Sequence, residues 1–148
     1  MENIVMILRQ IKQDVYKRLC DNRPQVLEKN RGYGVISISL NGLTFAVPLR
    51  SNLNHPNGFK TIFLKDKKIW SGLDYSKALI VKPEDFEPEA FKLKIEKEYE
   101  KLKANKSKIE KEFEAYVQGY ILFVKSGCGD EKAYKFTTLQ YFHDFLGL

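Results

Sequence analysis

The sequence has few of the residues that build metal centres and disulfide frameworks. It contains two cysteines and two histidines in 148 residues. Cys20 and Cys128 are too few for a disulfide framework and lack Cys-x-x-Cys spacing, so we interpret both as reduced thiols. No acidic cluster stands in an apolar context. These scarcities argue against a metal-dependent nuclease, and we expect neither a metal nor a cofactor.

Long apolar runs and familiar site signatures are absent as well. No stretch approaches the ~20 apolar residues that a bilayer requires. The chain begins M-E-N, which places an acid where a signal peptide carries basic residues. We therefore expect a cytoplasmic protein with no membrane partner. The sequence also has no glycine-rich Walker or Rossmann loop, no H-E-x-x-H and no G-x-S-x-G.

The composition that is present fits one basic globular domain over residues 1–148. A 43% hydrophobic content with ten phenylalanines is enough for a full core. The net charge of +6 favours a polyanion as partner over an acidic protein surface. Eight tyrosines and the phenylalanines are interleaved with the basic residues. Aromatic faces beside cations suit unpaired nucleotides, although most of these rings must fill the core.

A β-hairpin is the clearest structural prediction. Residues 35–40 and 43–47 are two apolar, β-rich runs joined by Asn41-Gly42, the dipeptide typical of tight hairpin turns. The second run leads through Pro48 into a polar loop that starts at Arg50, so the hairpin would present this loop from a rigid sheet.

Other segments predict a mixture of strands and helices, which indicates an α+β fold. Strands are expected at residues 3–8, 61–64 and 69–70 and at the end of 72–81. Helices are expected at about 9–20, from 91 to about 124 with a break at 105–107, and across 134–145.

The polar loop carries the candidate chemistry. Arg50, Ser51 and His55 supply a cation, a hydroxyl and an imidazole within six residues, which could hold a phosphodiester and move its protons. The alternative is a polar connector in which Arg50 pairs with a surface carboxylate and His55 is solvated. Further along, Asp74 is interpreted as the cap of a turn and Lys77 as solvated.

Three further features have ordinary explanations that remain open. Tyr33, between Gly32 and Gly34, could reach a ligand or begin a strand. The lysine-rich segment 92–111 is by default a solvated face, with RNA backbone contact as the alternative. His143 lies among aromatic residues and is interpreted as structural, since nothing polar nearby in the sequence would orient it.

Four motifs in order resemble a known family. They are R-G-Y-G-V (31–35), N-G-L-T-F-A-V-P-L-R-S-N (41–52) with His55, G-L-D-Y-S-K-A (72–78) and K-A-N-K-S-K-I-E (103–110). From about residue 8 to 124 the chain is similar to the ToxN/AbiQ-type endoribonuclease toxins of type III toxin–antitoxin systems, and in particular to their TenpN-like branch.

This resemblance implies a compact, twisted antiparallel sheet of about five or six strands with surrounding helices. It also implies an endoribonuclease that cuts its own repeat antitoxin RNA, expected to be pseudoknotted, and stays bound to it in a closed protein–RNA assembly. Free toxin would cleave cellular or phage mRNA, stopping growth or aborting infection.

The resemblance also assigns site residues. The family's Pro-Leu-(Thr or Arg)-Ser element aligns with Pro48 to Ser51. ToxN has a lysine two residues after its serine, where this chain has Leu53, so His55, Lys60 or Lys77 would have to supply that role.

For cleavage, the ribose 2'-hydroxyl would attack phosphorus to give a 2',3'-cyclic phosphate and a 5'-hydroxyl. His55 is expected to be base or acid, Ser51 a donor to phosphate and Arg50 a bidentate phosphate clamp, with Lys77 or Tyr33 completing the set. The residues expected to bind RNA are Arg31, Asn52, Asn54, Lys60, Tyr75, Lys103 and Lys106. Two rivals remain: a noncatalytic RNA-binding module, and a toxin-like fold that binds only protein.

Overall fold

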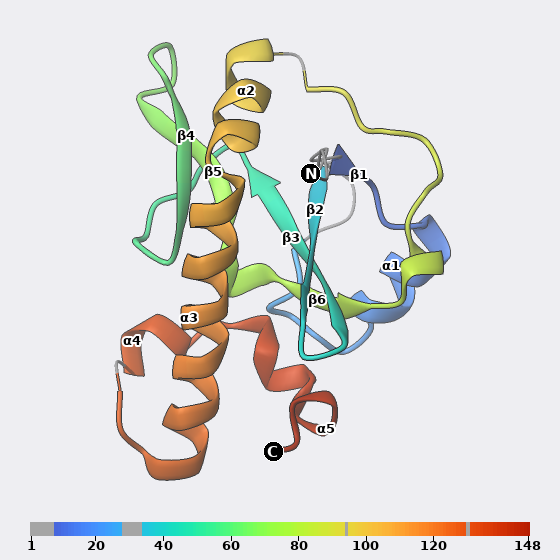
Figure 1. Cartoon of the computed structure of the whole chain (residues 1–148), viewed down its shortest axis with the longest axis vertical. Coiled ribbons are helices and arrows are strands. Elements are labelled where there is room, and N and C mark those ends of the chain that lie inside the picture. The colour runs from blue at the N-terminus through green and yellow to red at the C-terminus, as the bar shows by residue number, and fades with distance from the viewer. Residues whose placement is uncertain (1–7, 28–33, 94, 130) are drawn as a thin grey trace.

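The computed structural model describes residues 8–27, 34–93, 95–129 and 131–148. It shows an α+β fold in which helices surround a six-stranded antiparallel sheet (Figure 1), as predicted. Most of the strand expected at 3–8, and the predicted site residues Arg31 and Tyr33, lie outside the described residues.

The predicted hairpin is confirmed. β2 (Val35–Leu40) and β3 (Leu43–Arg50) pair antiparallel from Leu40–Leu43 to Val35–Pro48. Asn41 and Gly42 both have positive φ angles, 51° and 78°, as a type I′ turn requires. β3 does not stop before the polar loop but continues through Pro48, so that Arg50 is its last residue. Arg50 is therefore held by a strand.

β3 is the strand on which the sheet is assembled. Its first half lies between β2 and the short β6 (Leu79–Val81), and its last two residues pair with β5 (Ile69–Asp74). β4 (Gly58–Leu64) pairs with β5 and forms one edge, while β1 (Leu8–Arg9) pairs with β2 at the other. The end of β3 is thus the junction between the two parts of the sheet.

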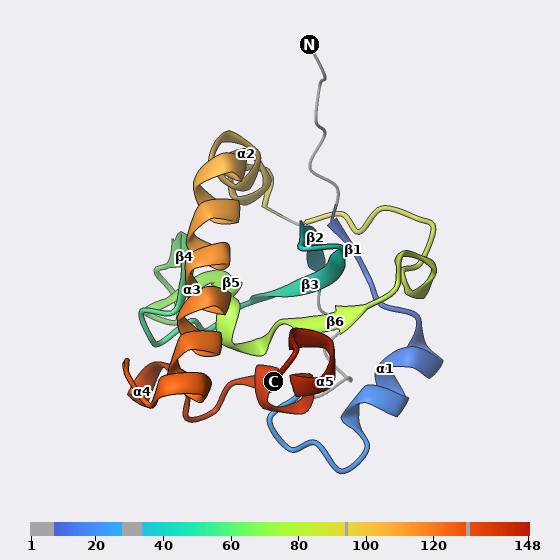
Figure 2. The ribbon, with the colours of Figure 1, turned by 60° about the horizontal axis from the view of Figure 1, so that its bottom comes forward.

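The helices lie on opposite sides of this sheet. α2 (Glu96–Ala104) and α3 (Lys106–Ser126) run along the β4–β5 side, whereas α1 (Gln13–Cys20) lies on the far side (Figures 1 and 2). The break at residue 105 agrees with the prediction, and α3 runs two residues beyond the predicted end at about 124, to a cap at Gly127, whose φ is 73°. No helix in the described ranges is both long enough and apolar enough to span a membrane.

Two helix starts differ from the prediction. α1 begins at Gln13, because residues 8–9 pair with β2 and Ile11 bridges to Phe86. α2 begins at Glu96, because the extended segment before it is tied to β1, with the Phe91 amide donating to the Leu8 carbonyl at 2.7 Å.

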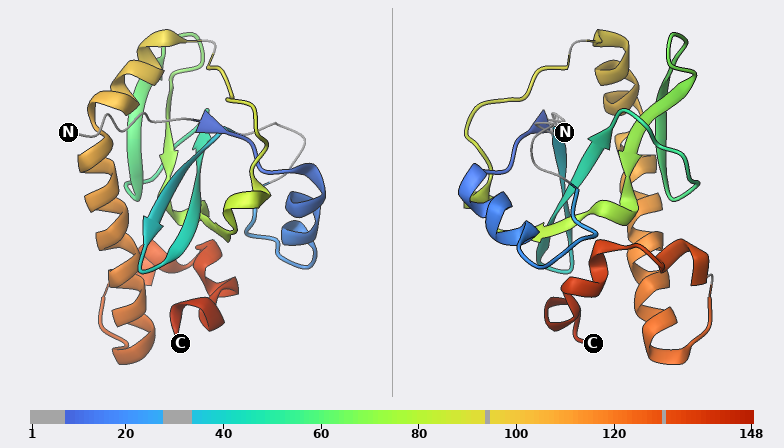
Figure 3. Two further views of the ribbon diagram at one scale, coloured as in Figure 1. Left: turned by 45° about the vertical axis from the view of Figure 1, so that its right-hand side comes forward. Right: turned by 180° about the vertical axis from the view of Figure 1, so that it is seen from behind.

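The predicted last helix is three short pieces: α4 (Glu131–Tyr134), a 3-10 turn (Thr138–Tyr141) and α5 (His143–Leu146). Thr137 interrupts it, since its side chain accepts from the Leu139 amide and starts a new turn. The 3-10 turn Thr138–Tyr141 contacts the 3-10 turn that follows β5 (Tyr75–Lys77), and the red C-terminal pieces lie below the sheet in both views of Figure 3.

The centre of the core lies between β3 and α3. Phe113 on α3 is fully buried, and its ring packs edge-on to Phe45 of β3 with centroids 5.1 Å apart. The ring of Tyr75, which follows β5, packs tilted against the Phe113 ring with centroids 5.7 Å apart. Phe113 therefore joins the long helix to the two strands whose ends lie at the candidate site described below.

Replacing Phe113 with alanine should lower the free energy of unfolding by about 3–5 kcal/mol, because a cavity would open between α3 and β3. Urea unfolding measures this change. Phe145→Ala is the matched control, since Phe145 is 59% exposed and the same truncation should change stability by less than about 0.5 kcal/mol. Equal effects of the two variants would contradict the assignment of Phe113 to the core.

Candidate functional site

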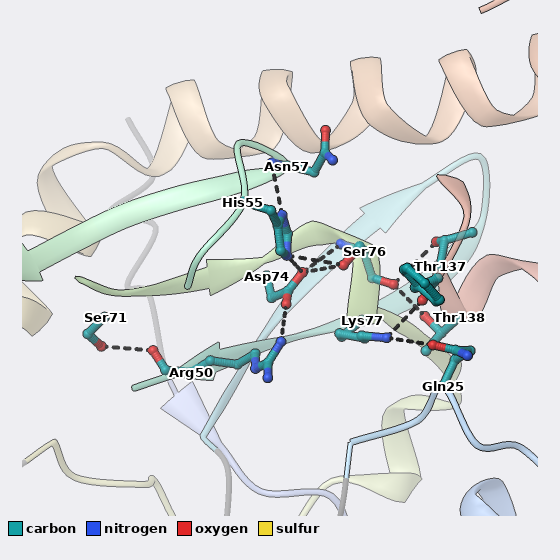
Figure 4. A network of polar contacts seen from close by, with 11 residues as sticks. Gln25, Arg50, His55, Asn57, Ser71, Asp74, Ser76, Lys77, Thr137 and Thr138 are labelled. Atoms are coloured by element: carbon teal, nitrogen blue, oxygen red, sulfur yellow. Dashed lines mark hydrogen bonds and ion pairs between the residues drawn. The ribbon is translucent and has the colours of Figure 1, made fainter. Parts of the chain in front are cut away.

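A buried carboxylate organises the polar residues at the strand ends. Asp74, the last residue of β5, has no exposed side-chain surface. Its Oδ2 accepts from Arg50 Nη1 at 2.8 Å, and its Oδ1 lies 3.1 Å from His55 Nε2 (Figure 4). Oδ1 also accepts from the amide and the hydroxyl of Ser76, at 3.0 and 2.5 Å. The carboxylate therefore joins a cation, an imidazole and a hydroxyl.

The strand register explains why Arg50 reaches Asp74. Arg50 is paired with Gly72, and side chains two residues apart on a strand point to the same face. Asp74 is therefore the diagonal neighbour of Arg50 across the β3–β5 pair, within reach of a long side chain. Gly72 is needed for close approach, because a Cβ there would lie 2.4 Å from the Phe59 carbonyl oxygen of β4.

His55 is held by an anchored loop. The loop between β3 and β4 is fixed by Leu53, which is 2% exposed and whose amide donates to the Trp70 carbonyl at 2.8 Å. The Asn57 amide donates to His55 Nδ1 at 3.1 Å, so a neutral ring carries its proton on Nε2, the atom that faces Asp74. The structure does not support the alternative of a solvated polar connector for Arg50 and His55.

The electrostatics of the cluster follow from this burial. Burial alone would raise the pKa of Asp74, but hydrogen bonds from His55, Ser76 and Arg50 outweigh it and leave that pKa below its usual value. The pKa of Lys77 is lowered, chiefly because burial disfavours the ammonium and also because Arg50 is near, while Asp74 opposes the shift. Lys77 is therefore easier to deprotonate than an exposed lysine.

Lys77 is not solvated in the way the sequence suggested. Its Nζ donates to Gln25 Oε1 at 3.2 Å and to the Phe136 carbonyl at 2.8 Å. Figure 4 shows the ammonium turned toward Gln25, away from Asp74. Because Gln25 and Phe136 lie far from Lys77 in sequence, the fold holds this lysine through two distant segments.

Ser51 lies apart from the buried cluster. Its side chain is exposed, and no hydrogen bond within the described ranges joins it to Arg50, His55 or Asp74. Ser76 is the hydroxyl that the structure brings to these groups, with its Oγ 3.5 Å from His55 Nε2. Any contact of Ser51 with a ligand would be made from the surface beside Arg50.

An open cleft of about 420 Å³ begins at His55 and runs between β4 and the α2–α3 junction. Its basic side chains are Lys60 from β4, Lys101 from α2 and Lys108 from α3. Of the lysines predicted to bind RNA, only Lys60 lines this cleft. Lys103 is exposed elsewhere on α2, and Lys106 pairs with Glu110 at 3.1 Å. The lysine-rich segment thus contributes to the cleft through other members.

The remaining predicted RNA contacts divide by exposure. Asn52 and Asn54 are exposed on the loop beside His55. Tyr75 is 3% exposed and its hydroxyl donates to Glu112 at 2.9 Å, so it packs in the core and does not offer its ring to a base. Burial, with the Glu112 hydrogen bond second, raises the pKa of Tyr75.

Sequence reasoning missed Asp74 as a site residue. It was recognised only as a turn cap, which it is, since it accepts from the Ser76 amide at the start of the 3-10 turn Tyr75–Lys77. The sequence does not show that β5 pairs with β3, and this pairing is what brings Asp74 beside Arg50. The interpretation of His143 needs one correction: a polar partner exists, because Tyr120 Oη lies 2.6 Å from His143 Nε2. Within the described ranges, no three metal-ligating side chains gather at one place.

Comparison with known proteins shows a similarity of fold and no similarity of sequence family. No family model matches the chain, and no curated protein matches it at a significant level. One solved structure is similar over 88% of this chain and 86% of its own, with a TM-score of 0.65 and 14% sequence identity. It comes from work on bacterial type III toxin–antitoxin systems and selective toxin inhibition by a non-coding RNA pseudoknot. At this identity the likeness concerns the fold.

Asp74→Asn should destabilise the protein by about 1–3 kcal/mol at pH 7, because Arg50 and His55 lose a buried charged partner. Since folding lowers the pKa of Asp74, its ionisation stabilises the fold above about pH 4, the unfolded value. That contribution is lost as pH falls through the lower folded value. The stability gap between the two proteins, measured by urea unfolding, should therefore be constant near neutrality and narrow below about pH 4.

Asp66→Asn is the control, because Asp66 is exposed in the β4–β5 turn. It should leave the unfolding free energy nearly unchanged at neutral pH. A gap for Asp74→Asn that persisted undiminished at the lowest pH would show that the effect came from packing and not from charge.

Proposed function

We propose that this chain is an endoribonuclease toxin of a type III toxin–antitoxin system, of the ToxN/AbiQ type and its TenpN-like branch. The observation that carries the proposal is the pairing of Arg50 and His55 on one buried carboxylate, at the end of a lysine-lined cleft. The fold likeness to a structure from the study of such systems supports it. The proposed catalytic domain spans residues 1–148 and would act in the cytoplasm.

The proposed partner is the chain's own antitoxin, a pseudoknotted repeat RNA. The protein would cut the precursor into repeat units and remain bound to them in a closed protein–RNA assembly. Released toxin would cut cellular or phage mRNA, with arrest of growth or abortion of phage infection as the result. The +6 charge and the three lysines of the cleft suit such a polyanion.

The proposed reaction is transesterification. The 2'-oxygen bonds to phosphorus and its proton passes to a base, while the bond from phosphorus to the 5'-oxygen breaks and that oxygen receives a proton. The products are a 2',3'-cyclic phosphate and a 5'-hydroxyl. Because the sequence has two histidines and no acidic cluster in an apolar context, we propose that its own side chains perform each step.

The roles follow from the chemistry of each group. Arg50, whose side chain is 26% exposed, would bind the nonbridging oxygens, with Ser51 donating to the phosphate from the surface. His55 and Lys77 are the described groups that could transfer protons, and the lowered pKa of Lys77 suits it to a base. Ser76 and Asp74 would position His55. Tyr33 remains a third proton-transfer candidate.

A noncatalytic RNA-binding module is the second candidate, and one observation favours it. Both ring nitrogens of His55 are engaged, Nδ1 by the Asn57 amide and Nε2 by Asp74. For His55 to transfer a proton, the ring must give up one of these contacts when RNA binds. If the His55 ring kept both contacts when RNA bound, the protein would bind RNA and leave it intact.

Cleavage separates the two candidates. Purified protein is incubated with its neighbouring repeat RNA in the presence of EDTA, and the fragment ends are identified. The proposal predicts fragments with 2',3'-cyclic phosphate and 5'-hydroxyl ends, whereas intact RNA in complex with the protein would favour the noncatalytic module. A short tandem repeat followed by a terminator immediately upstream of the reading frame is the corresponding genomic expectation.

His55→Ala should reduce the cleavage rate by about 10²- to 10⁴-fold, the usual contribution of one proton-transfer group, while RNA affinity changes little. Rates are measured under single-turnover conditions and affinity by filter binding. His143→Ala, the same change at the other histidine, should cut at the wild-type rate, because His143 contacts Tyr120 and not the cluster. Wild-type cleavage by His55→Ala would move the proton-transfer role to Lys77 or a tyrosine.

A further inference from the structure

An exposed aromatic surface lies on the β4–β5 hairpin, away from Asp74. Trp70 on β5 is 36% exposed, and its cross-strand partner Phe63 on β4 is 44% exposed. Their ring centroids are 5.5 Å apart. Trp70 is the single tryptophan of the chain and has no role in the proposed cleavage chemistry.

Two lysines converge on Trp70 from different elements. Lys60 Nζ of β4 lies 5.7 Å from the centroid of the Trp70 ring, and Lys101 Nζ of α2 lies 5.8 Å from it. Lys101 also lies 5.7 Å from the Phe59 ring. The indole is therefore accompanied by two positive charges, neither of which forms an ion pair with a carboxylate in the described part of the chain.

A buried polar cluster fixes this arrangement. Glu98 of α2 is 6% exposed and accepts hydrogen bonds from the hydroxyls of Thr61 and Ser71. Thr61 follows Lys60 and Ser71 follows Trp70, while Glu98 precedes Lys101 by about one helical turn. The contacts that bind α2 to the hairpin thus set the positions of Lys60 and Lys101 relative to the Trp70 ring.

The two lysines also connect Trp70 to the candidate site. Lys60 and Lys101 line the same cleft that begins at His55. Lys60 follows His55 by five positions, so their backbones can lie at most roughly 17 Å apart, the length of a fully extended chain. A strand of RNA that reached His55 could therefore continue along the lysines to Trp70.

The combination selects a ligand with both a ring and negative charge. Phosphate alone would satisfy Lys60 and Lys101 but would gain nothing from an exposed indole. An unpaired nucleotide can use both the indole and the lysines. Its base can stack on the Trp70 ring, while its phosphates pair with the two ammonium groups, which then leave the ring face. A paired base in a duplex has its faces already covered by its neighbours.

We propose that Trp70 is a stacking site for an unpaired base in single-stranded RNA, with Lys60 and Lys101 binding the adjoining phosphates. The inference rests on the proposed function and adds to it a contact that would favour substrates with an unpaired segment several nucleotides from the scissile bond. Stacking on an aromatic ring tolerates all four bases, so this site selects for single strands more than for sequence.

Because Trp70 is the only tryptophan, its fluorescence reports on this site directly. The protein is used as the His55→Ala variant, so that RNA is not cut, and is titrated with a mixed-sequence 12-nucleotide single-stranded RNA. Saturable quenching is expected, whereas inorganic polyphosphate should bind without comparable quenching. Trp70→Ala should weaken binding of the same RNA by roughly 5- to 100-fold, and Trp70→Phe should retain most of the affinity.

Phe145→Ala is the matched control, since Phe145 is an exposed aromatic residue on α5, far along the chain from the hairpin. It should bind RNA like the parent. The inference is overturned if RNA binds with unchanged fluorescence and Trp70→Ala keeps parental affinity, or if polyphosphate quenches as strongly as RNA. RNA that is cut by wild-type protein but does not quench Trp70 would refute the stacking site alone. Failure of both cutting and binding would refute the proposed function as well.

Discussion

The structure of the candidate site depends on the buried carboxylate of Asp74, which requires hydrogen-bond donors around it. Asp74 has no exposed side-chain surface, and an ionised carboxylate in such a place is strongly destabilising unless charged or polar donors surround it. Arg50, His55 and Ser76 are those donors, and they come from the end of β3, the following loop and the turn after β5. The need to satisfy one carboxylate therefore joins three segments and leaves a cation and an imidazole partly exposed at the surface.

The surrounding fold stabilises this arrangement from two sides. The 3-10 turn after Asp74 is held by Thr137 and Thr138, whose hydroxyls donate to the Ser76 carbonyl. On the other side, Glu98 holds α2 against the β4–β5 hairpin and so forms one wall of the cleft. Two buried carboxylates, Asp74 and Glu98, thus fix the candidate site and the cleft next to it.

Much of the fold could be predicted because its signals are local. Asn41-Gly42 determines a turn between two β-rich runs, and the polar step at residue 105 separates two helical registers. The errors occurred where distant contacts decide the outcome. The extended segment before α2 is held by Leu8, some eighty residues earlier, and the C-terminal helix is interrupted where Thr137 caps a new turn and bonds to the turn after β5.

The same distinction applies to the candidate site. Arg50 and His55 could be selected because they lie in one short loop, but Asp74 is twenty-four residues beyond Arg50 and becomes its neighbour only through strand register. Likewise, composition indicated a lysine-rich face without indicating which lysines face the cleft. The phase of α2 and α3 places Lys101 and Lys108 there, in place of Lys103 and Lys106.

The central claim is that Arg50 and His55, held on Asp74, receive a phosphodiester. A structure of the protein with its repeat RNA, fully 2'-O-methylated so that no 2'-hydroxyl can attack, tests this most directly. The account predicts a phosphate within hydrogen-bond distance of the Arg50 guanidinium and beside the His55 ring. RNA bound with no phosphate in reach of either side chain would contradict it.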